Sequence, residues 1–168
     1  MEDKEAILRM VADYENPGEG GFYDDAGEEG LQPHLIRGDT FDAAQMLDPA
    51  NRPSQNTVAY SIEEPRGVAF RYTALDPKAQ YRVRVTLAMP RIPKDVIDLP
   101  RDAVKAENLL ADDAYLAEGI EVPSFTAKQF EYDVPKKLTQ DGTLDLTFER
   151  VENGIGCIVS EVWLMKRP

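Results

Sequence analysis

The sequence has very few cysteine and histidine residues, the residues that form disulfides and many metal sites. Its 168 residues include one cysteine, Cys157, and one histidine, His34. A single cysteine excludes an internal disulfide and a site with several thiolates, and a single histidine excludes multi-histidine metal sites. No apolar run approaches the roughly 20 residues of a membrane-spanning helix. We therefore expect no insertion into a membrane.

Basic residues are also scarce. The chain carries 19 lysines and arginines against 31 acidic residues, for a formal net charge of −12. Nucleic acids are bound largely by cations that neutralise phosphates, so we expect no nucleic-acid partner. The acidic residues 1–5 are not followed by an apolar segment, which is not the pattern of a signal peptide. Two settings remain open, the cytoplasm or part of a longer exported chain.

Apolar residues near the amino terminus recur with the helical period. Ile7, Met10, Val11 and Tyr14 follow the spacing i, i+3, i+4, i+7 and form one stripe. The Asn-Pro-Gly sequence that follows should end the helix, because proline cannot continue it. The pattern predicts a helix over residues 1–16, either packed on the domain that follows or linking it to a preceding domain.

From Val58 onward the apolar period changes to two residues, after a glycine-rich stretch (residues 18–57) that we expect to be irregular. Residues 68–73 and 81–89 predict a hairpin joined by a turn. Further strands are expected near residues 105–110, 120–122, 128–134, 143–151 and 157–165. Such spacing predicts an all-β fold, a jelly-roll-like antiparallel β-sandwich over residues 17–168 with a short N-terminal α-helix.

Three short segments carry a family resemblance. They are Gly20-Gly21-Phe22-Tyr23-Asp24-Asp25, the turn at residues 74–77 with the strand 81–85, and residues 156–164. Together they resemble the galactose-binding-like β-sandwiches, which include many bacterial carbohydrate-binding modules. The resemblance spans roughly residues 20–164. It implies a domain appended to a large exported bacterial protein, where it holds a glycan or an adjacent domain.

The same resemblance implies a structural calcium ion between the early acidic loop and the closing strand. Asp24, Asp25 and Glu161 are the positions that match. Calcium takes six to eight oxygen ligands, and the glycine-rich loop offers carbonyls beside these carboxylates. The alternative is that Asp24 and Asp25 are turn or capping residues and that Glu161 pairs with an arginine.

The outward face of the predicted hairpin is a candidate ligand surface. Arg71 and Arg84 lie on it, and an arginine fork matches the geometry of a carboxylate, as in an acidic sugar. Tyr72 is a candidate neighbour. The alternative is that the arginines form cross-strand pairs with acidic residues such as Glu131 and Asp145.

His34 is a candidate sugar contact or proton donor, and its alternative is a hydrogen-bonded structural role. Catalytic motifs are lacking: there is no Gly-x-Ser-x-Gly, no phosphate loop and no His-Glu-x-x-His. The adjacent acids Asp112 and Asp113 are expected to form a hairpin tip. We therefore expect a non-catalytic accessory domain, extracellular or periplasmic within a longer chain, whose partner is a carbohydrate or an adjacent domain of the same polypeptide. The alternatives are a structural protein–protein interaction domain and a small carbohydrate-active enzyme.

Overall fold

The computed structural model describes residues 2–62, 67–91, 94–95 and 102–167. These residues form the helices α1 (Glu2–Glu15) and α2 (Pro53–Asn56) and the 3₁₀ turn η1 (Lys136–Leu138). The strands are β1 (Phe22–Asp25), β2 (Leu35–Arg37), β3 (Asp39–Asp42), β4 (Thr57–Ser61), β5 (Val68–Tyr72), β6 (Gln80–Leu87), β7 (Ala106–Ala111), β8 (Ala114–Glu121), β9 (Lys128–Val134), β10 (Leu144–Arg150), β11 (Cys157–Val159) and β12 (Glu161–Arg167).

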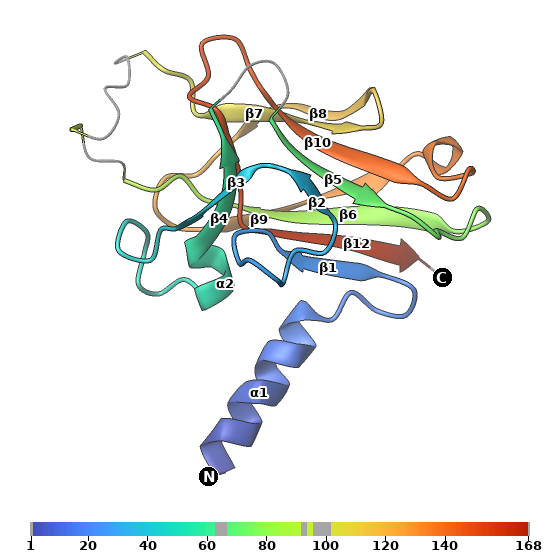
Figure 1. Ribbon diagram of the computed structural model, residues 1–168, viewed down its shortest axis with the longest axis horizontal. Coiled ribbons are helices and arrows are strands. Elements are labelled where there is room, and N and C mark those ends of the chain that lie inside the picture. Colours follow the sequence, from blue (N-terminus) through green and yellow to red (C-terminus); the bar gives the residue numbers. More distant parts are fainter. Residues whose placement is uncertain (1, 63–66, 92–93, 96–101, 168) are drawn as a thin grey trace.

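Two antiparallel sheets face one another in a sandwich (Figure 1). One has the order β1-β12-β6-β9, the other β2-β5-β10-β7-β8, and a small third sheet has the order β11-β4-β3. This arrangement confirms the predicted all-β sandwich with a short N-terminal helix.

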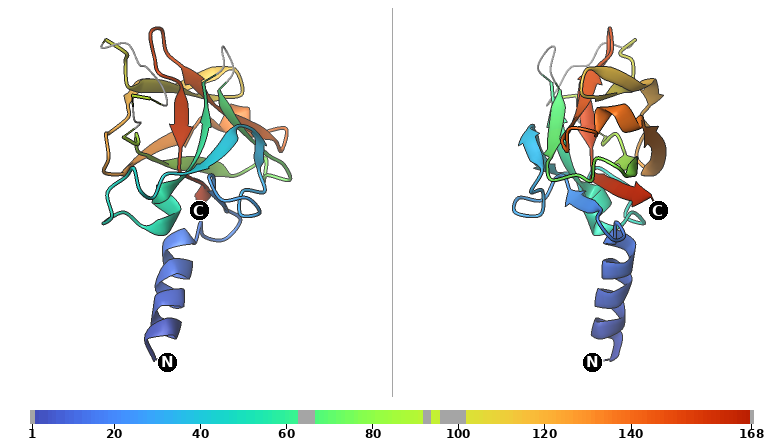
Figure 2. Two further views of the ribbon diagram at one scale, coloured as in Figure 1. Left: turned by 60° about the vertical axis from the view of Figure 1, so that its left-hand side comes forward. Right: turned by 90° about the vertical axis from the view of Figure 1, so that its right-hand side faces the viewer.

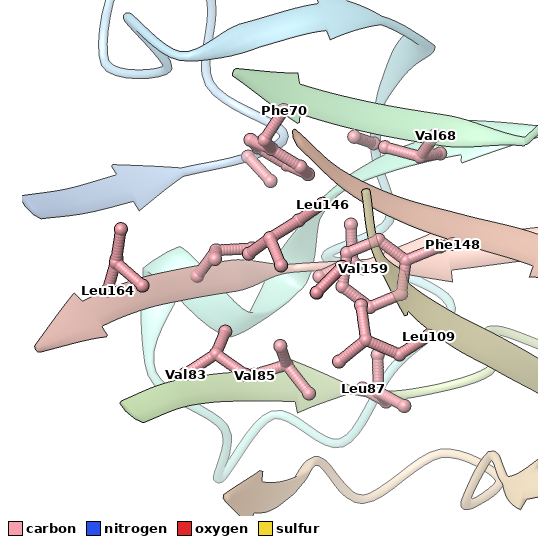
Figure 3. Packing of buried hydrophobic residues seen from close by; sticks show 14 of the residues in the cluster. Val68, Phe70, Val83, Val85, Leu87, Leu109, Leu146, Phe148, Val159 and Leu164 are labelled. Carbon is pink, nitrogen blue, oxygen red and sulfur yellow. The ribbon is translucent and has the colours of Figure 1, made fainter. Parts of the chain in front are cut away.

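The core lies mainly between the two larger sheets, and its side chains are largely aliphatic and aromatic (Figure 3). Alternate residues of β6, β7 and β10 are buried in it, as the two-residue period predicted. Each such side chain contributes about 1.5–3 kcal/mol when fully buried. The labelled residues in Figure 3 are Val68, Phe70, Val83, Val85, Leu87, Leu109, Leu146, Phe148, Val159 and Leu164.

The predicted hairpin of residues 68–73 and 81–89 is wrong. β5 pairs with β2 and β10, whereas β6 pairs with β12 and β9, so the two strands belong to opposite sheets. The connection between them crosses the edge of the core. Leu75 is buried there, and its N–H donates to the carbonyl of Gly142 at 2.9 Å. Alternation identified the buried face of each strand but not its neighbour.

Residues 18–57 are also more regular than predicted, since they contain β1, β2, β3 and α2. β1 is short, and two of its four residues are aspartates, which are depleted in strands. Its pairing with β12 places Phe22 opposite Leu164 and Asp25 opposite Glu161. Long-range pairing therefore forms this strand against its local propensity.

The last predicted strand is broken at Ser160. β11 pairs with β4, while β12 lies between β1 and β6 in the first sheet. The N–H of Ser160 donates to the carbonyl of Thr86 at 2.9 Å, and its own carbonyl accepts from Ala26 at 2.8 Å. The break lets Glu161 begin β12 at the point where the first sheet meets the N-terminal helix.

Helix α1 extends away from the sandwich and meets it only at its carboxyl end (Figures 1 and 2). The helix ends before Gly18, which has a φ of +80° and whose N–H donates to Asn16 Oδ1 at 2.8 Å. Its apolar stripe is largely exposed: the exposed fractions are 56% at Ile7, 59% at Met10 and 39% at Val11. Tyr14 alone of the stripe reaches the body of the protein.

Candidate functional site

A buried carboxylate joins the helix to the sandwich. Glu161 opens β12, lies opposite Asp25 on β1 and Thr86 on β6, and is fully buried. Burial of an ionised carboxylate is costly unless hydrogen bonds compensate for the lost water. Four hydroxyl groups supply them. Tyr14 and Thr86 each donate to Oε1 at 2.8 Å, and Tyr23 and Ser54 donate to Oε2 at 2.9 and 2.8 Å.

The four donors come from four different elements, namely α1, β1, α2 and β6. Burial, together with the charge of Glu161, raises the pKa of Tyr14 and of Tyr23, so both phenols remain donors throughout the working pH range. We refer to Glu161 with its donors Tyr14, Tyr23, Ser54 and Thr86 as the hydroxyl cluster. It acts as a junction that fixes the end of α1 on the sandwich.

Aromatic and cationic groups surround the hydroxyl cluster. The indole of Trp163 is fully buried, donates from Nε1 to the carbonyl of Glu15 at 3.1 Å, and is contacted by the edge of Tyr14. The Arg52 guanidinium lies over the Tyr14 ring, 3.9 Å from its centroid. Arg84 lies over the Trp163 ring at 5.5 Å. Trp163 therefore packs on the face of β12 that α1 covers.

Asp25 shares this region. Its Oδ1 accepts from Thr57 Oγ1 at 3.0 Å. Burial, reinforced by the negative charge of Glu161, raises the pKa of Asp25 to about 7. Burial and Glu161 also raise the pKa of Glu15.

Asp24 points to the other side of β1, as neighbouring strand residues must, and builds a separate group. Its Oδ1 accepts the backbone N–H of His34 at 2.9 Å, and its Oδ2 lies 2.9 Å from His34 Nδ1. The Tyr72 hydroxyl donates to the same Oδ2 at 3.2 Å. Asp24 is fully buried, and burial raises its pKa, while the contacts with His34 and Tyr72 oppose that shift.

The imidazole of His34 is held by rings as well as by hydrogen bonds. It stacks on Tyr72 with centroids 4.5 Å apart, and Phe22 meets it edge-on at 4.9 Å. Its side chain is 20% exposed. In the part of the chain that the structure describes, Nε2 has no protein partner, and it is not enclosed. The arrangement presents one ring nitrogen to solvent in a fixed direction.

The structure thus brings together two of the four predicted ligand residues, His34 and Tyr72. Arg71 lies on the opposite face of β5 and forms a two-pronged pair with Asp145, with both N···O distances 2.8 Å. Arg84 lies on the other sheet and donates to Glu131 at 2.7 Å. Both arginines make the cross-strand pairs that the sequence offered as the alternative to ligand binding.

The three predicted calcium ligands do not converge. Asp24 faces His34, whereas Asp25 and Glu161 face the helix junction, where four hydroxyls already occupy the Glu161 oxygens. Among the described residues, no group of three histidine, cysteine or acidic side chains is placed to hold a metal ion. An ion between Asp25 and Glu161 would have to displace hydroxyl groups, so these residues do not form a ready-made site. Calcium binding stays a prediction.

A further buried acid went unnoticed in the sequence. Glu107 on β7 is fully buried; its Oε2 accepts the N–H of Ile158 at 2.8 Å, while Oε1 has no hydrogen-bond partner among the residues that the structure describes. Burial raises the pKa of Glu107 to about 8. The nearby thiol of Cys157 is buried, and burial with the Glu107 charge raises its pKa. The alternating burial of β7 could have indicated Glu107, because its position has the parity of Leu109.

The adjacent acids Asp112 and Asp113 form the tip of the β7–β8 hairpin, as expected. Asp112 has a φ of +52°, and its Oδ1 accepts the N–H of Asp145 at 3.0 Å. A positive φ is ordinary for an aspartate in a turn, and the contact with Asp145 joins the hairpin tip to β10. Within the described residues, no helix is long and apolar enough to cross a membrane.

Comparison with known proteins gives the fold. No protein-family model and no curated protein matches the chain. Among solved structures, a calcium-binding mutant of β-glucuronidase 2 from Bacteroides uniformis is similar over 91% of this chain and 19% of its own, with a TM-score of 0.62 and 14% identity. The ANX1 ectodomain of Arabidopsis thaliana is similar over 88% of this chain and 42% of its own, with a TM-score of 0.64 and 10% identity.

A third similar structure is a complex of the plant peptide RALF23 with FER and LLG2. It covers 89% of this chain and 40% of its own, with a TM-score of 0.58 and 15% identity. The chain therefore spans less than half the length of each of these three structures. At such low identity the likeness establishes a shared β-sandwich fold and nothing more specific.

Proposed function

We propose that this chain is a non-catalytic accessory domain of a larger exported polypeptide and that it binds carbohydrate. The observation that carries the proposal is that the same sandwich recurs as less than half of much longer chains, among them a β-glucuronidase and plant ectodomains. Within this proposal the chain is a galactose-binding-like module, and its place is outside the cytoplasm.

The sugar contact in this proposal is His34. Because Asp24 accepts hydrogen bonds from the His34 backbone and from Tyr72, it acts as a carboxylate and directs the ring proton of His34 to Nδ1. Nε2 is then an acceptor that faces solvent, where it suits a sugar hydroxyl. Tyr72 and Phe22 fix the ring plane, so little side-chain freedom is lost when a ligand binds.

Retention on immobilised neutral polysaccharides tests the proposal, with a glycan array to identify the ligand. The informative variant is His34→Asn, because asparagine can still donate to Asp24 from the position of Nδ1 but has no group at Nε2. We expect His34→Asn to keep the melting temperature close to that of the wild type and to lose retention. Lys78→Ala, at an exposed turn, is the control. Retention of His34→Asn at the wild-type level would remove His34 from the site.

The implied calcium ion has its own test. If the ion binds at Asp25 and Glu161, adding calcium to chelator-treated protein raises the melting temperature, and Glu161→Gln abolishes the rise. An unchanged melting temperature would end the calcium hypothesis and leave sugar binding by His34 intact, since Asp24 and His34 lie on the other side of β1.

A second candidate function is interaction with a neighbouring domain, and the apolar stripe of α1 favours it. Ile7, Leu8 and Met10 are each more than half exposed, on a helix whose last turn is fixed by the hydroxyl cluster. If a neighbouring domain covers the stripe, hydrogen exchange over residues 4–12 is slower in the full-length polypeptide than in the isolated chain. Equal exchange rates in both would rule this out. An enzymatic role would instead require glycan turnover that disappears when Asp112 is replaced.

A further inference from the structure

Phe125 adopts a backbone conformation that aromatic residues seldom adopt. Its φ is +73°, in the left-handed region, where a residue with a Cβ atom is disfavoured by roughly 1–2 kcal/mol. The other described non-glycine residues with positive φ, Ala74, Asp112 and Asn153, lie in connections between strands. Such strain persists where surrounding contacts impose it, and it concentrates at ligand-binding positions.

Hydrogen bonds from distant segments impose the conformation. The N–H of Phe125 donates to the carbonyl of Met89 at 2.9 Å, and its own carbonyl accepts from the Asp48 N–H and from Asn51 Nδ2, both at 3.1 Å. Asn51 Oδ1 in turn accepts from the Ala127 N–H at 3.2 Å. These bonds join residues 43–51, 88–91 and 123–127. Beneath them lies a small separate apolar cluster of Ala43, Leu47 and Ala88.

An arginine side chain, that of Arg91, lies against Phe125. The guanidinium carbon of Arg91 lies 4.1 Å from the centroid of the Phe125 ring. The backbone N–H of Arg91 donates to the carbonyl of Met46 at 2.9 Å. Although the chain has a net charge of −12, Arg91 has no carboxylate partner among the described residues. Arg71 and Arg84, by contrast, are both paired with acids.

A lysine adds to the positive charge of this loop. Lys105 Nζ donates to Ser124 Oγ at 3.1 Å, next to Phe125 in the chain, and within the described ranges it too lacks an acidic partner. Two cations that lack an acidic partner among the described residues therefore contact adjacent residues of one loop, Ser124 and Phe125. We refer to Arg91, Lys105, Ser124 and Phe125 as the arginine–phenylalanine loop site.

We propose that the arginine–phenylalanine loop site binds the carboxylate group of a saccharide acid. Stacking on Phe125 fixes one face of the Arg91 guanidinium, which leaves its N–H edge available to two carboxylate oxygens. The acidic surface elsewhere favours a ligand with one carboxylate over a dense polyanion. The saccharide part of this inference rests on the proposed function; recognition of a carboxylate rests on the loop alone.

The test is a nuclear magnetic resonance titration of the whole chain, which follows the Nε–H of Arg91 and the amides of Phe125 and Ala127. The probes are the methyl glycoside of galacturonic acid, its neutral methyl ester, and N-acetylglutamate amide as a carboxylate of peptide type. We expect the free acid to shift these signals to saturation and the ester to leave them unchanged. Weaker binding of the peptide-type carboxylate supports the saccharide assignment, and tighter binding of it overturns that assignment.

Two variants distinguish the contribution of the planar guanidinium group to binding from that of its positive charge. Arg91→Ala and Arg91→Lys should both weaken binding of the acid about tenfold or more, because lysine keeps the charge but lacks the planar fork. Lys78→Ala, which removes one positive charge at a distant turn, should leave binding unchanged. Wild-type binding by Arg91→Ala, or equal weakening by Lys78→Ala, would overturn the proposal.

The His34 proposal and the proposal for the arginine–phenylalanine loop site can be refuted independently. His34→Asn should bind the galacturonic acid glycoside as the wild type does, while Arg91→Ala should retain neutral polysaccharide. If no saccharide acid shifts the Arg91 signal, the loop site is refuted and the His34 proposal stands. If neutral glycans are not retained but the acid binds Arg91, the His34 proposal is refuted and the loop site stands.

Discussion

Glu107→Gln should remove a large part of the pH dependence of stability. In the folded chain burial raises the pKa of Glu107 to about 8, from its ordinary value of 4.5. The folded state therefore holds this proton more tightly than the unfolded state does. The contribution of Glu107 to stability is fully present below pH 4.5 and is lost as the pH rises toward 8.

The magnitude follows from these two pKa values. Each unit of pKa difference corresponds to about 1.4 kcal/mol, so the loss between pH 5.5 and pH 8.5 is about 3 kcal/mol. Glutamine is neutral at both values and can still accept the N–H of Ile158. We therefore expect the stability of Glu107→Gln relative to the wild type to increase by about 3 kcal/mol between pH 5.5 and pH 8.5.

Urea unfolding followed by the fluorescence of Trp163, the single tryptophan, measures this difference. The raised pKa of Asp25 acts in the same direction, but it is common to both proteins and cancels. Glu118→Gln, at an exposed position of β8, matches the chemical change without burial. A difference between Glu107→Gln and the wild type that is constant from pH 5.5 to 8.5 would refute the reasoning.

Substitutions at three further positions probe other contacts. Glu161→Ala leaves four hydroxyl donors without their acceptor and should cost about 3 kcal/mol or more in urea unfolding; a loss under 1 kcal/mol would contradict the junction role. Phe125→Gly should be more stable than Phe125→Ala by roughly 1 kcal/mol, because only glycine adopts positive φ freely, and equal stability would mean that the backbone there is not strained. Arg71→Ala removes an exposed ion pair and should leave the midpoint of urea unfolding close to that of the wild type, whereas a clear decrease would indicate a structural role for the pair with Asp145.

The sequence predicted the sandwich because its longest strands bury one face each. The alternation of apolar residues in β6 is a local property, and it survives in the structure as Tyr81, Val83, Val85 and Leu87 in the core. Strand pairing is not local. The same alternation in β5 and β6 suggested a hairpin. In the structure the chain instead crosses from one sheet to the other at the buried Leu75.

The site was harder to predict for a related reason. Asp24 and Asp25 were predicted to bind calcium together with Glu161, but the opposite directions of the two aspartates follow from β1 being a strand, which its composition did not reveal. The partners of Glu161 come from segments as distant as Tyr14 and Thr86. Phe125 gave no signal at all, since a strained φ is imposed by hydrogen bonds that the sequence does not display.

The most direct test of carbohydrate binding uses the fact that the chain has one histidine. The Hε1 proton of His34 therefore gives a single assignable signal in a nuclear magnetic resonance titration with a retained neutral glycan. The account predicts that this signal shifts to saturation at the same glycan concentration that saturates retention. Saturable glycan binding that leaves the His34 signal unmoved would contradict it.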